Sequence, residues 1–387
     1  MYIMGLEEIE AVKKVIESGQ LFRYRGGENG ESDKFEKEWS DKIGCKYTTA
    51  MTSGTAALIC GLAGMGIGPG DEVIVPAYTF MATASACLAV GAIPILADID
   101  ESLTIDPKDI EQKITSRTKA IIPVHICGLP CDMDAIMQIA KNHNLMVLED
   151  SCQADGGSYH GRHLGSIGDA GAFSFNQFKI LSCGEGGALS TDSLTIHERG
   201  LIHHDSGAAF RSYLPNMHVQ VFAGWNFRIN EILSAILRVQ LTRLEGILSN
   251  LRREKNIIKN ELDGRKDFVF NPVNDVNGDC ATTAAMLFPS AKDMRKFLHT
   301  LKTNGIEANS PIDSGLHVYT NWTPIMEKCG AHHPARDAYK TSNVEINYTP
   351  DMCKKTLSIL ERTAYLLTSV NRPENELRTL IDKIKRI

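Results

Sequence analysis

Two neighbouring stretches decide the fold of this chain: LMVLEDSCQA at residues 145–154 and AGAFSFNQFKILSCGEGGALS at residues 170–190. Each begins as a short apolar strand and becomes polar where that strand is expected to end. Residues 53–190 repeat the rhythm, because short apolar runs alternate with longer helical patterns. This alternation predicts an α/β fold whose mostly parallel sheet is buried on both faces.

The expected elements follow along the chain. We expect helices from about residue 55, after residue 82 and over 132–144, and strands at 72–75, before residue 99, at 119–127, at 145–150 and at 170–176. Ligands of such sheets bind outside the carboxyl ends of the strands. The sites to examine are therefore residues 76–80, 125, 149–153 and 174–179.

The 387 residues are too many for one ordinary core, so two lobes are expected. Residues 231–262 form one long amphipathic pattern with no proline, which suits a bridge between lobes. We predict a large domain at 1–245 and a smaller C-terminal α+β domain at 246–387.

Composition excludes several classes of protein. The 41 basic and 47 acidic residues give a net charge of -6, which does not favour nucleic acid or an anionic membrane as a partner. The N-terminus does not resemble a secretory signal, and no run of 18 apolar residues occurs, so we expect a cytoplasmic protein. The ten cysteines are scattered without a C-x-x-C pair, so buried structural thiols are expected and a zinc site is not.

Lys179 is the first candidate for chemistry. A lone lysine is usually a solvated surface charge, but this one follows an apolar strand and precedes Gly184, Gly186 and Gly187. A lysine among apolar neighbours and phosphate-binding loops can lose its proton and form an imine.

Two further segments are expected to lie near Lys179. Residues 52–58, TSGTAAL, lead into a helix whose free N–H groups can bind phosphate, although a plain N-cap explains the same residues. Asp150 follows a buried strand, where it needs either a cationic partner or a capping role. A protonated pyridine nitrogen is such a partner, and Gln153 could reach a phenolic oxygen on the same ring.

Seven motifs in order carry a resemblance: SGTAAL, PAYTF, PVHICG, EDSCQA, SFNQFK, GEGG and GWNFRINE. The chain resembles the DegT/DnrJ/EryC1/StrS family of sugar aminotransferases, which use pyridoxal 5'-phosphate (PLP) and have the type I fold of PLP-dependent transferases. The similarity runs from about residue 19 to 241 and weakens afterwards.

The resemblance implies a role for each matched residue. Lys179 is the Schiff-base lysine, Asp150 the partner of the pyridinium and Gln153 the neighbour of the ring oxygen. The phosphate ligands and the stacking aromatic are, in order, Gly54, Thr55, Ala56, Ser174 and Phe80. The metal-like run His203, His204 and Asp205 is interpreted as loop residues, and no metal is expected.

Asn226 is implied to reach the phosphate of the neighbouring subunit's cofactor, which would place each site at a homodimer interface. Arg228 and Glu231 are expected to fix that loop. Arg23, Tyr24 and Arg25 form a candidate grip on the substrate, and His317, Tyr319, Asn321 and Trp322 a candidate substrate wall.

The implied reaction moves an amino group from glutamate, which leaves as 2-oxoglutarate, to a keto or aldehydo sugar, nucleotide-linked or free. Such a step belongs to surface-polysaccharide (lipopolysaccharide) or amino-sugar biosynthesis. Within the family, the chain looks most similar to 8-amino-3,8-dideoxy-octulosonate transaminases and then to inosose aminotransferases. Two alternatives stay open: a PLP-dependent sugar dehydratase or isomerase, in which some relatives have His in place of Lys179, and a non-catalytic regulator.

Overall fold

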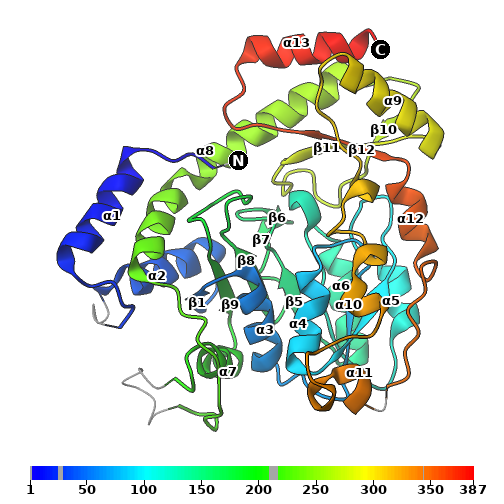
Figure 1. Cartoon of the computed structure of the whole chain (residues 1–387). Helices are drawn as coiled ribbons and strands as arrows, with labels where there is room; N and C mark the ends of the chain where they lie inside the picture. Colours follow the sequence, from blue (N-terminus) through cyan, green and yellow to red (C-terminus); the bar gives the residue numbers. More distant parts are fainter. Residues whose placement is uncertain (1, 25–28, 209–216, 343) are drawn as a thin grey trace.

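The computed structural model describes residues 2–24, 29–208, 217–342 and 344–387. Its centre is a seven-stranded sheet in the order β1-β9-β8-β5-β4-β2-β3 (Figure 1). The strands are β1 Tyr47–Met51, β2 Glu72–Pro76, β3 Ile93–Ala97, β4 Thr118–Ile121, β5 Met146–Asp150, β8 Ala170–Ser174 and β9 Gly187–Thr191. The pairs from β8 through β5, β4 and β2 to β3 are parallel, whereas β9 and β1 are antiparallel to their neighbours. The predicted mostly parallel sheet is confirmed.

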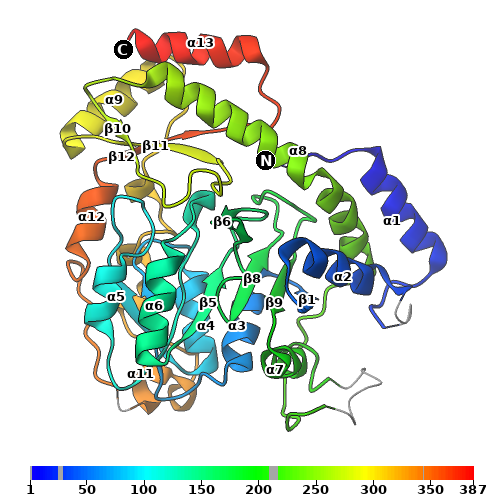
Figure 2. The same cartoon turned by 180° about the vertical axis from the view of Figure 1, so that it is seen from behind.

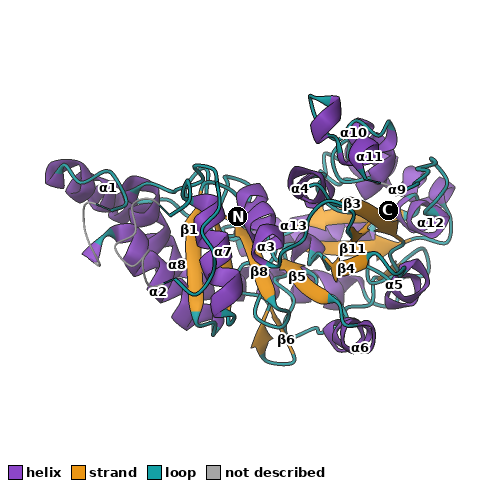
Figure 3. Cartoon of the chain, turned by 90° about the horizontal axis from the view of Figure 1, so that it is seen from below, coloured by secondary structure: helices purple, strands orange, loops and turns teal. Residues whose placement is uncertain are grey.

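Helices cover both faces of this sheet (Figure 3). One apolar core lies under α3, α4 and α7, and a second lies under α2, α5, α6 and the first half of α8. These helices are α2 Glu31–Ile43, α3 Gly54–Gly64, α4 Ala82–Val90, α5 Pro107–Lys113, α6 Met133–His143, α7 Leu194–His204 and α8 Glu231–Leu262. Burial on both faces explains why the central strands are apolar throughout.

The 32-residue helix α8 connects this layer to a second lobe, as Figures 1 and 2 show. Its residues Leu244 and Leu248 belong to the core of the large sheet, whereas Ile258 and Leu262 belong to the core of the small one. The small sheet has the order β10-β11-β12. It comprises β10 Val269–Phe270, β11 Thr283–Leu287 and β12 Thr363–Leu367, with α9 Ala291–Thr303 and α13 Glu374–Lys385 beside it. The domain boundary at 245 remains a prediction, and it falls inside α8.

The C-terminal part of the chain does not stay in the small lobe. Val318, Trp322 and Ile325 pack into the same core as α3 and α4. The elements of this returning segment are η4 Pro311–Asp313, η5 Tyr319–Asn321, α10 Thr323–Met326, η6 Pro334–Arg336, α11 Ala338–Thr341 and α12 Lys354–Leu360. The two lobes therefore share apolar packing.

The remaining elements are peripheral. Helix α1 Leu6–Ser18 lies against α8, where Arg243 pairs with Glu8 at 3.0 Å. Short elements complete the chain: η2 Ile126–Gly128, β6 Ser158–Tyr159 and β7 Arg162–His163. All ten cysteines are free thiols. Among the described residues, the helices are all too short or too polar to cross a bilayer.

Candidate active site

A cavity of about 610 Å³ opens at the carboxyl ends of β5 and β8, where the rule for parallel sheets places a ligand. Both lobes contribute to its lining. The residues from the large lobe are Ser53, Gly54, Thr55, Leu58, Thr79, Phe80, Ala82, Thr83, Val124, Cys127, Asp150, Cys152, Gln153, Ser174, Asn176, Phe178, Lys179, Ile180 and Glu185. Those from the C-terminal part are Thr282, Thr283, Leu316, His317, Leu367 and Thr368.

The start of helix α3 forms one end of the cavity. Ser53 caps the helix, since its Oγ accepts a hydrogen bond from the Ala56 N–H at 3.1 Å. Helix geometry leaves the N–H groups of Gly54 and Thr55 without intrahelical acceptors. A Cβ at position 54 would lie 2.8 Å from the Cβ of Ser174, so only glycine allows β8 to approach the helix so closely. The capping and phosphate-binding interpretations are therefore compatible, because the cap uses one donor and leaves two.

Asp150 lies at the end of β5, 5% exposed, with room for one more partner. Its Oδ2 accepts from the Thr83 hydroxyl at 2.8 Å, and its Oδ1 accepts from the Cys152 N–H at 3.2 Å. Thr79 lies 2.8 Å from Thr83, and it must donate because Thr83 already gives its proton to Asp150. A carboxylate can accept about four hydrogen bonds, so capacity remains on the cavity side. The sequence did not identify this Thr79–Thr83–Asp150 chain.

Gln153 is oriented by a backbone contact. Its Oε1 accepts from the Cys127 N–H at 2.9 Å, which leaves its Nε2 hydrogens for another acceptor. Cys127 adopts a positive φ of 53°, so this contact depends on an unusual backbone turn. The side chain of Gln153 lines the cavity as a hydrogen-bond donor.

Lys179 lies in a tight turn after β8 and lines the cavity. Its N–H donates to the Asn176 carbonyl at 3.0 Å, and the Gln177 N–H donates to the Gly184 carbonyl at 3.1 Å. The turn is thereby fixed across the loop. Burial and then the Asp150 carboxylate raise the pKa of the nearby Cys152 thiol well above the ordinary 9.0, which favours its neutral form.

Phe80 and His317 lie side by side at the cavity wall, with ring centroids 5.6 Å apart. The Ser314 hydroxyl lies 2.7 Å from Nδ1 of His317. Burial, and then the positive charge of Lys179, lower the pKa of His317 below its ordinary 6.5. His317 therefore favours the neutral ring at neutral pH, and its contact with substrate stays a prediction.

The rest of the predicted substrate wall is corrected. Tyr319 and Trp322 are fully buried in the core. Tyr319 donates its hydroxyl to the Pro350 carbonyl at 2.6 Å, and Trp322 donates Nε1 to the Leu316 carbonyl at 3.1 Å. The Asn321 amide donates to the Ser314 carbonyl at 3.2 Å. The structure places threonines 282, 283 and 368 at the cavity instead, and no sequence pattern marks them, because they lie in or beside small-lobe strands without a motif.

The predicted N-terminal substrate grip is also placed elsewhere. Arg23 is 1% exposed and forms an ion pair with Glu36, and it donates to the Ala50 carbonyl at 2.8 Å. This placement argues against substrate contact and gives Arg23 a structural role. Tyr24 donates its hydroxyl to Asp205 at 2.7 Å. Arg25 lies outside the described residues.

The expected loop residues lie apart from the cavity lining. Asn226 is exposed, and its Oδ1 accepts from the Arg228 N–H at 3.3 Å. Arg228 pairs with Asp205 at 2.6 Å, and Glu231 accepts from the N–H of Glu31 at the start of α2. The Arg228 contact is that of a residue that fixes the loop, whereas Glu231 caps α2. Among the described residues, no group of three or more His, Cys, Asp and Glu side chains is arranged to hold a metal.

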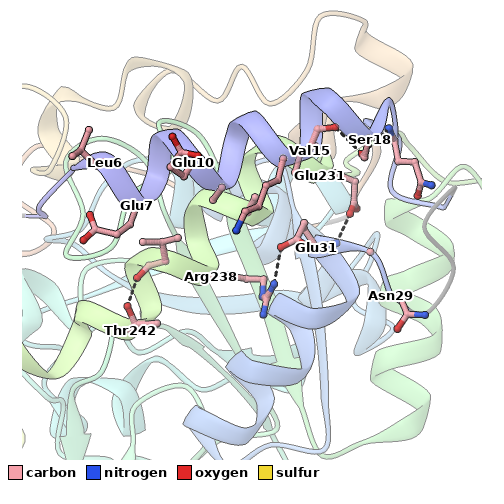
Figure 4. Close-up of a pocket in the computed structure, with 16 residues that line it drawn as sticks. Leu6, Glu7, Glu10, Val15, Ser18, Asn29, Glu31, Glu231, Arg238 and Thr242 are labelled. Carbon is pink, nitrogen blue, oxygen red and sulfur yellow. Dashed lines mark hydrogen bonds and ion pairs between the residues drawn. The ribbon is translucent and has the colours of Figure 1, made fainter.

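A larger cavity of about 910 Å³ lies between α1, the start of α2 and α8 (Figure 4). It contains charged groups, but Arg238 is held by Glu31 at 2.7 Å and Glu231 is used in capping α2. Lys14 lies in the same cavity as Glu7, Glu10 and Glu31. The smaller cavity is the better candidate, since it lies at the carboxyl ends of parallel strands, where Asp150 and the start of α3 keep hydrogen-bonding capacity toward a ligand.

The residues of that cavity fit PLP. The α3 start and Ser174 offer donors for a phosphate, the open side of Asp150 suits a protonated ring nitrogen, and Gln153 offers a donor for the ring oxygen. Lys179 supplies the amine. This set, on a parallel sheet with a smaller second lobe, defines a PLP-dependent enzyme of fold type I.

Residues 3–362 match the model of the DegT/DnrJ/EryC1/StrS aminotransferase family, so the chain belongs to that family of PLP-dependent enzymes. The match extends well beyond residue 241, where the motifs alone weakened. Spore coat polysaccharide biosynthesis protein SpsC of Bacillus subtilis (strain 168) is 41% identical over 278 residues, 70% of this chain and 68% of that protein. GDP-perosamine synthase of Caulobacter vibrioides is 42% identical over 223 residues, 57% of this chain and 58% of that protein.

The fold comparison covers both lobes. The crystal structure of 3-amino-5-hydroxybenzoic acid (AHBA) synthase matches 100% of this chain and 97% of its own, with a TM-score of 0.82 and 26% sequence identity. The predicted fold class, enzyme class and cofactor are confirmed.

Proposed function

We propose that this aminotransferase moves an amino group from L-glutamate to a keto or aldehydo sugar in surface-polysaccharide or amino-sugar biosynthesis. The observation that carries the proposal is the joint placement of Lys179, Asp150, Gln153 and the α3 start around one cavity. The names of the relatives, a spore coat polysaccharide biosynthesis protein and a GDP-perosamine synthase, support a sugar acceptor.

The residues divide the work as follows. Bound PLP supplies an electron sink for the charge that forms when the donor loses its Cα proton. Lys179 would hold the cofactor through its Nζ, and its free Nζ would accept the proton that the amino donor loses from Cα. Asp150 keeps a positive charge on the ring nitrogen, and the Thr79–Thr83 hydroxyls hold that carboxylate in place.

The cavity wall suits a sugar. Phe80 and Leu316 offer apolar surface, while His317 and threonines 282, 283 and 368 offer hydroxyl and imidazole groups. Carbohydrates present both hydroxyls and apolar C–H faces, so this mixture matches them. The acceptor panel therefore includes free and nucleotide-linked sugars, an octulosonate and an inosose.

We further propose a cytoplasmic homodimer in which each site is completed by Asn226 of the other subunit. Four large apolar side chains near the loop support an interface, being 38–54% exposed: Leu21, Phe22, Val221 and Trp225. Surfaces that expose several such residues together are typical of protein–protein contacts.

The test uses PLP-loaded protein in two half-reactions. L-Glutamate should bleach the visible band of the lysine-bound cofactor and release one 2-oxoglutarate per site. A panel of keto and aldehydo sugars, free and nucleotide-linked, should then restore the band with one acceptor. No spectral change with glutamate, glutamine or any other amino donor would overturn the proposal. Water loss from a sugar without 2-oxoglutarate would favour the dehydratase.

A further inference from the structure

Asp205, at the end of α7, is a fully buried carboxylate that the proposed chemistry leaves unassigned. Its Oδ2 accepts from the Tyr24 hydroxyl at 2.7 Å, and its Oδ1 accepts from Nη1 of Arg228 at 2.6 Å. The two donors come from segments 204 residues apart in sequence. A buried charge is retained at a site only with such partners, so Asp205 joins the N-terminal segment to the loop that contains Arg228.

The same loop is fixed on both sides by its backbone. The Ser206 N–H donates to the Trp225 carbonyl at 2.8 Å, and the Phe227 N–H donates to the His204 carbonyl at 2.9 Å. On the other side, the Thr52 N–H donates to the Phe227 carbonyl at 2.9 Å. Thr52 immediately precedes the Ser53 cap of α3. Residues 225–228 therefore lie between the end of α7 and the phosphate-binding helix start.

Asn226 and Trp225 are the exposed residues of this segment, and Asn226 is the one with a polar side chain. It forms an isolated antiparallel bridge with Asp205, and its Oδ1 is occupied by the Arg228 N–H at 3.3 Å. That contact determines the amide orientation and leaves the Nδ2 hydrogens for an acceptor outside the loop. An amide that presents hydrogens suits an anion such as a phosphate.

We infer that Asp205 is a positioning residue for the cofactor phosphate of the neighbouring subunit. It holds Arg228 and Tyr24, and these hold residues 225–228 so that Asn226 presents its amide hydrogens to that phosphate. We call the contacts of Asp205 with Tyr24 and Arg228 the clamp. Tyr24, which was expected to contact the substrate, belongs to this clamp instead. The inference rests on the proposed homodimer with shared sites.

The direct test is PLP affinity, measured by titrating the apo-dimer and following absorbance. Asp205→Asn keeps the size of the side chain but removes the charge that Arg228 requires, and loss of a charge-assisted hydrogen bond corresponds to about a tenfold to hundredfold rise in Kd. Asn226→Ala should raise Kd similarly, and the double variant should be no weaker than either single one, because both act through one contact. Additive losses, or a wild-type Kd for Asp205→Asn, would overturn the inference.

Mixed dimers separate this inference from the function on which it rests. In a mixed dimer, one subunit carries Asp205→Asn and the other carries Lys179→Ala. The site that keeps Lys179 is then completed by the subunit in which Asp205 and Asn226 are intact. One site per dimer should regain the wild-type Kd for PLP. If Asp205→Asn and Asn226→Ala weaken PLP binding but neither is rescued in mixed dimers, the shared site fails and the clamp acts within one subunit. If wild-type protein binds PLP yet no donor bleaches it, the proposed function fails independently.

Tyr24→Phe provides a second variant in case Asp205→Asn does not fold. It removes one donor and no charge, so Kd should rise about threefold to tenfold. Size-exclusion chromatography with light scattering should find a dimer for each variant. A Tyr24→Phe protein that is dimeric and binds PLP with the wild-type Kd would contradict the clamp.

Discussion

Glu149 and Asp150 are consecutive on β5, yet their surroundings differ because successive side chains of a strand point to opposite faces. Glu149 is fully buried and accepts four hydrogen bonds, from the N–H groups of residues 165, 167 and 168 and from Nε2 of His125. Asp150 accepts two and opens onto the cavity. A carboxylate with every acceptor used stabilises the fold, whereas one with acceptors left over can bind a cationic ligand.

His125 belongs to the same face of the sheet as Glu149, where the acceptors of the carboxylate are all used. The Cys131 N–H donates to its Nδ1 at 3.1 Å, so the ring carries its proton on Nε2 and donates it to Glu149 at 3.1 Å. The sequence placed residue 125 among the positions to examine, since it follows a strand. Its contacts with Cys131 and Glu149 show that His125 stabilises the Glu149 face of the sheet and does not line the cavity.

Replacing Asp150 tests the open side and should have the largest effect. Asp150→Asn cannot keep a positive charge on the ring nitrogen, so kcat/KM should fall about a thousandfold, comparable to losing one preorganised electrostatic group. The free energy of unfolding of the apo-protein should change by less than about 1 kcal/mol, because the amide oxygen can still accept from the Cys152 N–H while the amide nitrogen donates to the Thr83 hydroxyl, which then donates to Thr79. Steady-state kinetics and urea unfolding measure the two quantities. If the unfolding free energy fell by as much as the transition-state stabilisation calculated from kcat/KM, the assignment of Asp150 to the chemistry and Glu149 to stability would be contradicted.

Glu149→Gln is the matched change on the sealed side. The new amide hydrogens would face N–H groups that now donate to Glu149, so the free energy of unfolding should fall by about 3 kcal/mol. Protein that remains folded at low temperature should keep most of its kcat/KM. Strong loss of activity with unchanged stability would assign Glu149 to the chemistry instead.

Thr83→Val isolates the support of Asp150. The change keeps the shape of the side chain and removes the hydroxyl that Asp150 accepts from at 2.8 Å. We expect kcat/KM to fall about tenfold, the equivalent of one hydrogen bond to a charged group. Thr79→Val, one step further along the chain, should cost less. Equal losses at both positions, or none at either, would show that the hydroxyl chain does not position the carboxylate.

His317 gives the smallest effect, on pH dependence. Its lowered pKa means that the unfolded state binds more protons than the folded state as pH falls through 6.5. The contribution of His317 to the free energy of unfolding is therefore present above pH 6.5 and is lost as the pH falls below it. Replacing His317 with Gln should make the loss of stability at low pH smaller. In the apo-protein, histidine NMR should find the pKa below 6.5, and Lys179→Ala should raise it. A pKa at or above 6.5 would contradict the burial of a neutral ring.

Much of this organisation could be predicted from the sequence. The strands ending at Asp150 and Ser174 are continuous apolar runs, and the bounds of α8 follow from an uninterrupted amphipathic pattern capped by Asn230. Motif order pointed to Gly54, Thr55, Phe80, Asp150, Gln153, Ser174 and Lys179, which line one cavity, and also to Ala56 and Asn226, which do not; their roles toward the cofactor stay predictions. These patterns involve residues that are close together in the chain, so they can be recognised without knowing the tertiary structure.

The remaining features depend on contacts between distant segments. Tyr319 and Trp322 look like a substrate wall because aromatic residues near polar ones resemble a binding site, but the returning segment packs them into the large core. Arg23 looks like an anion grip until Glu36 and the Ala50 carbonyl are seen to occupy it. The Thr83–Asp150 contact joins residues 67 apart, which no local pattern records.

The central claim is that Lys179 is the residue that holds the cofactor. Borohydride reduction of the PLP-loaded protein, followed by digestion and mass spectrometry, fixes the cofactor on whichever lysine carries it. The account predicts one label per subunit, on the peptide that contains Lys179, and no label when glutamate is added before reduction. A label on another lysine, or label that glutamate does not remove, would contradict it.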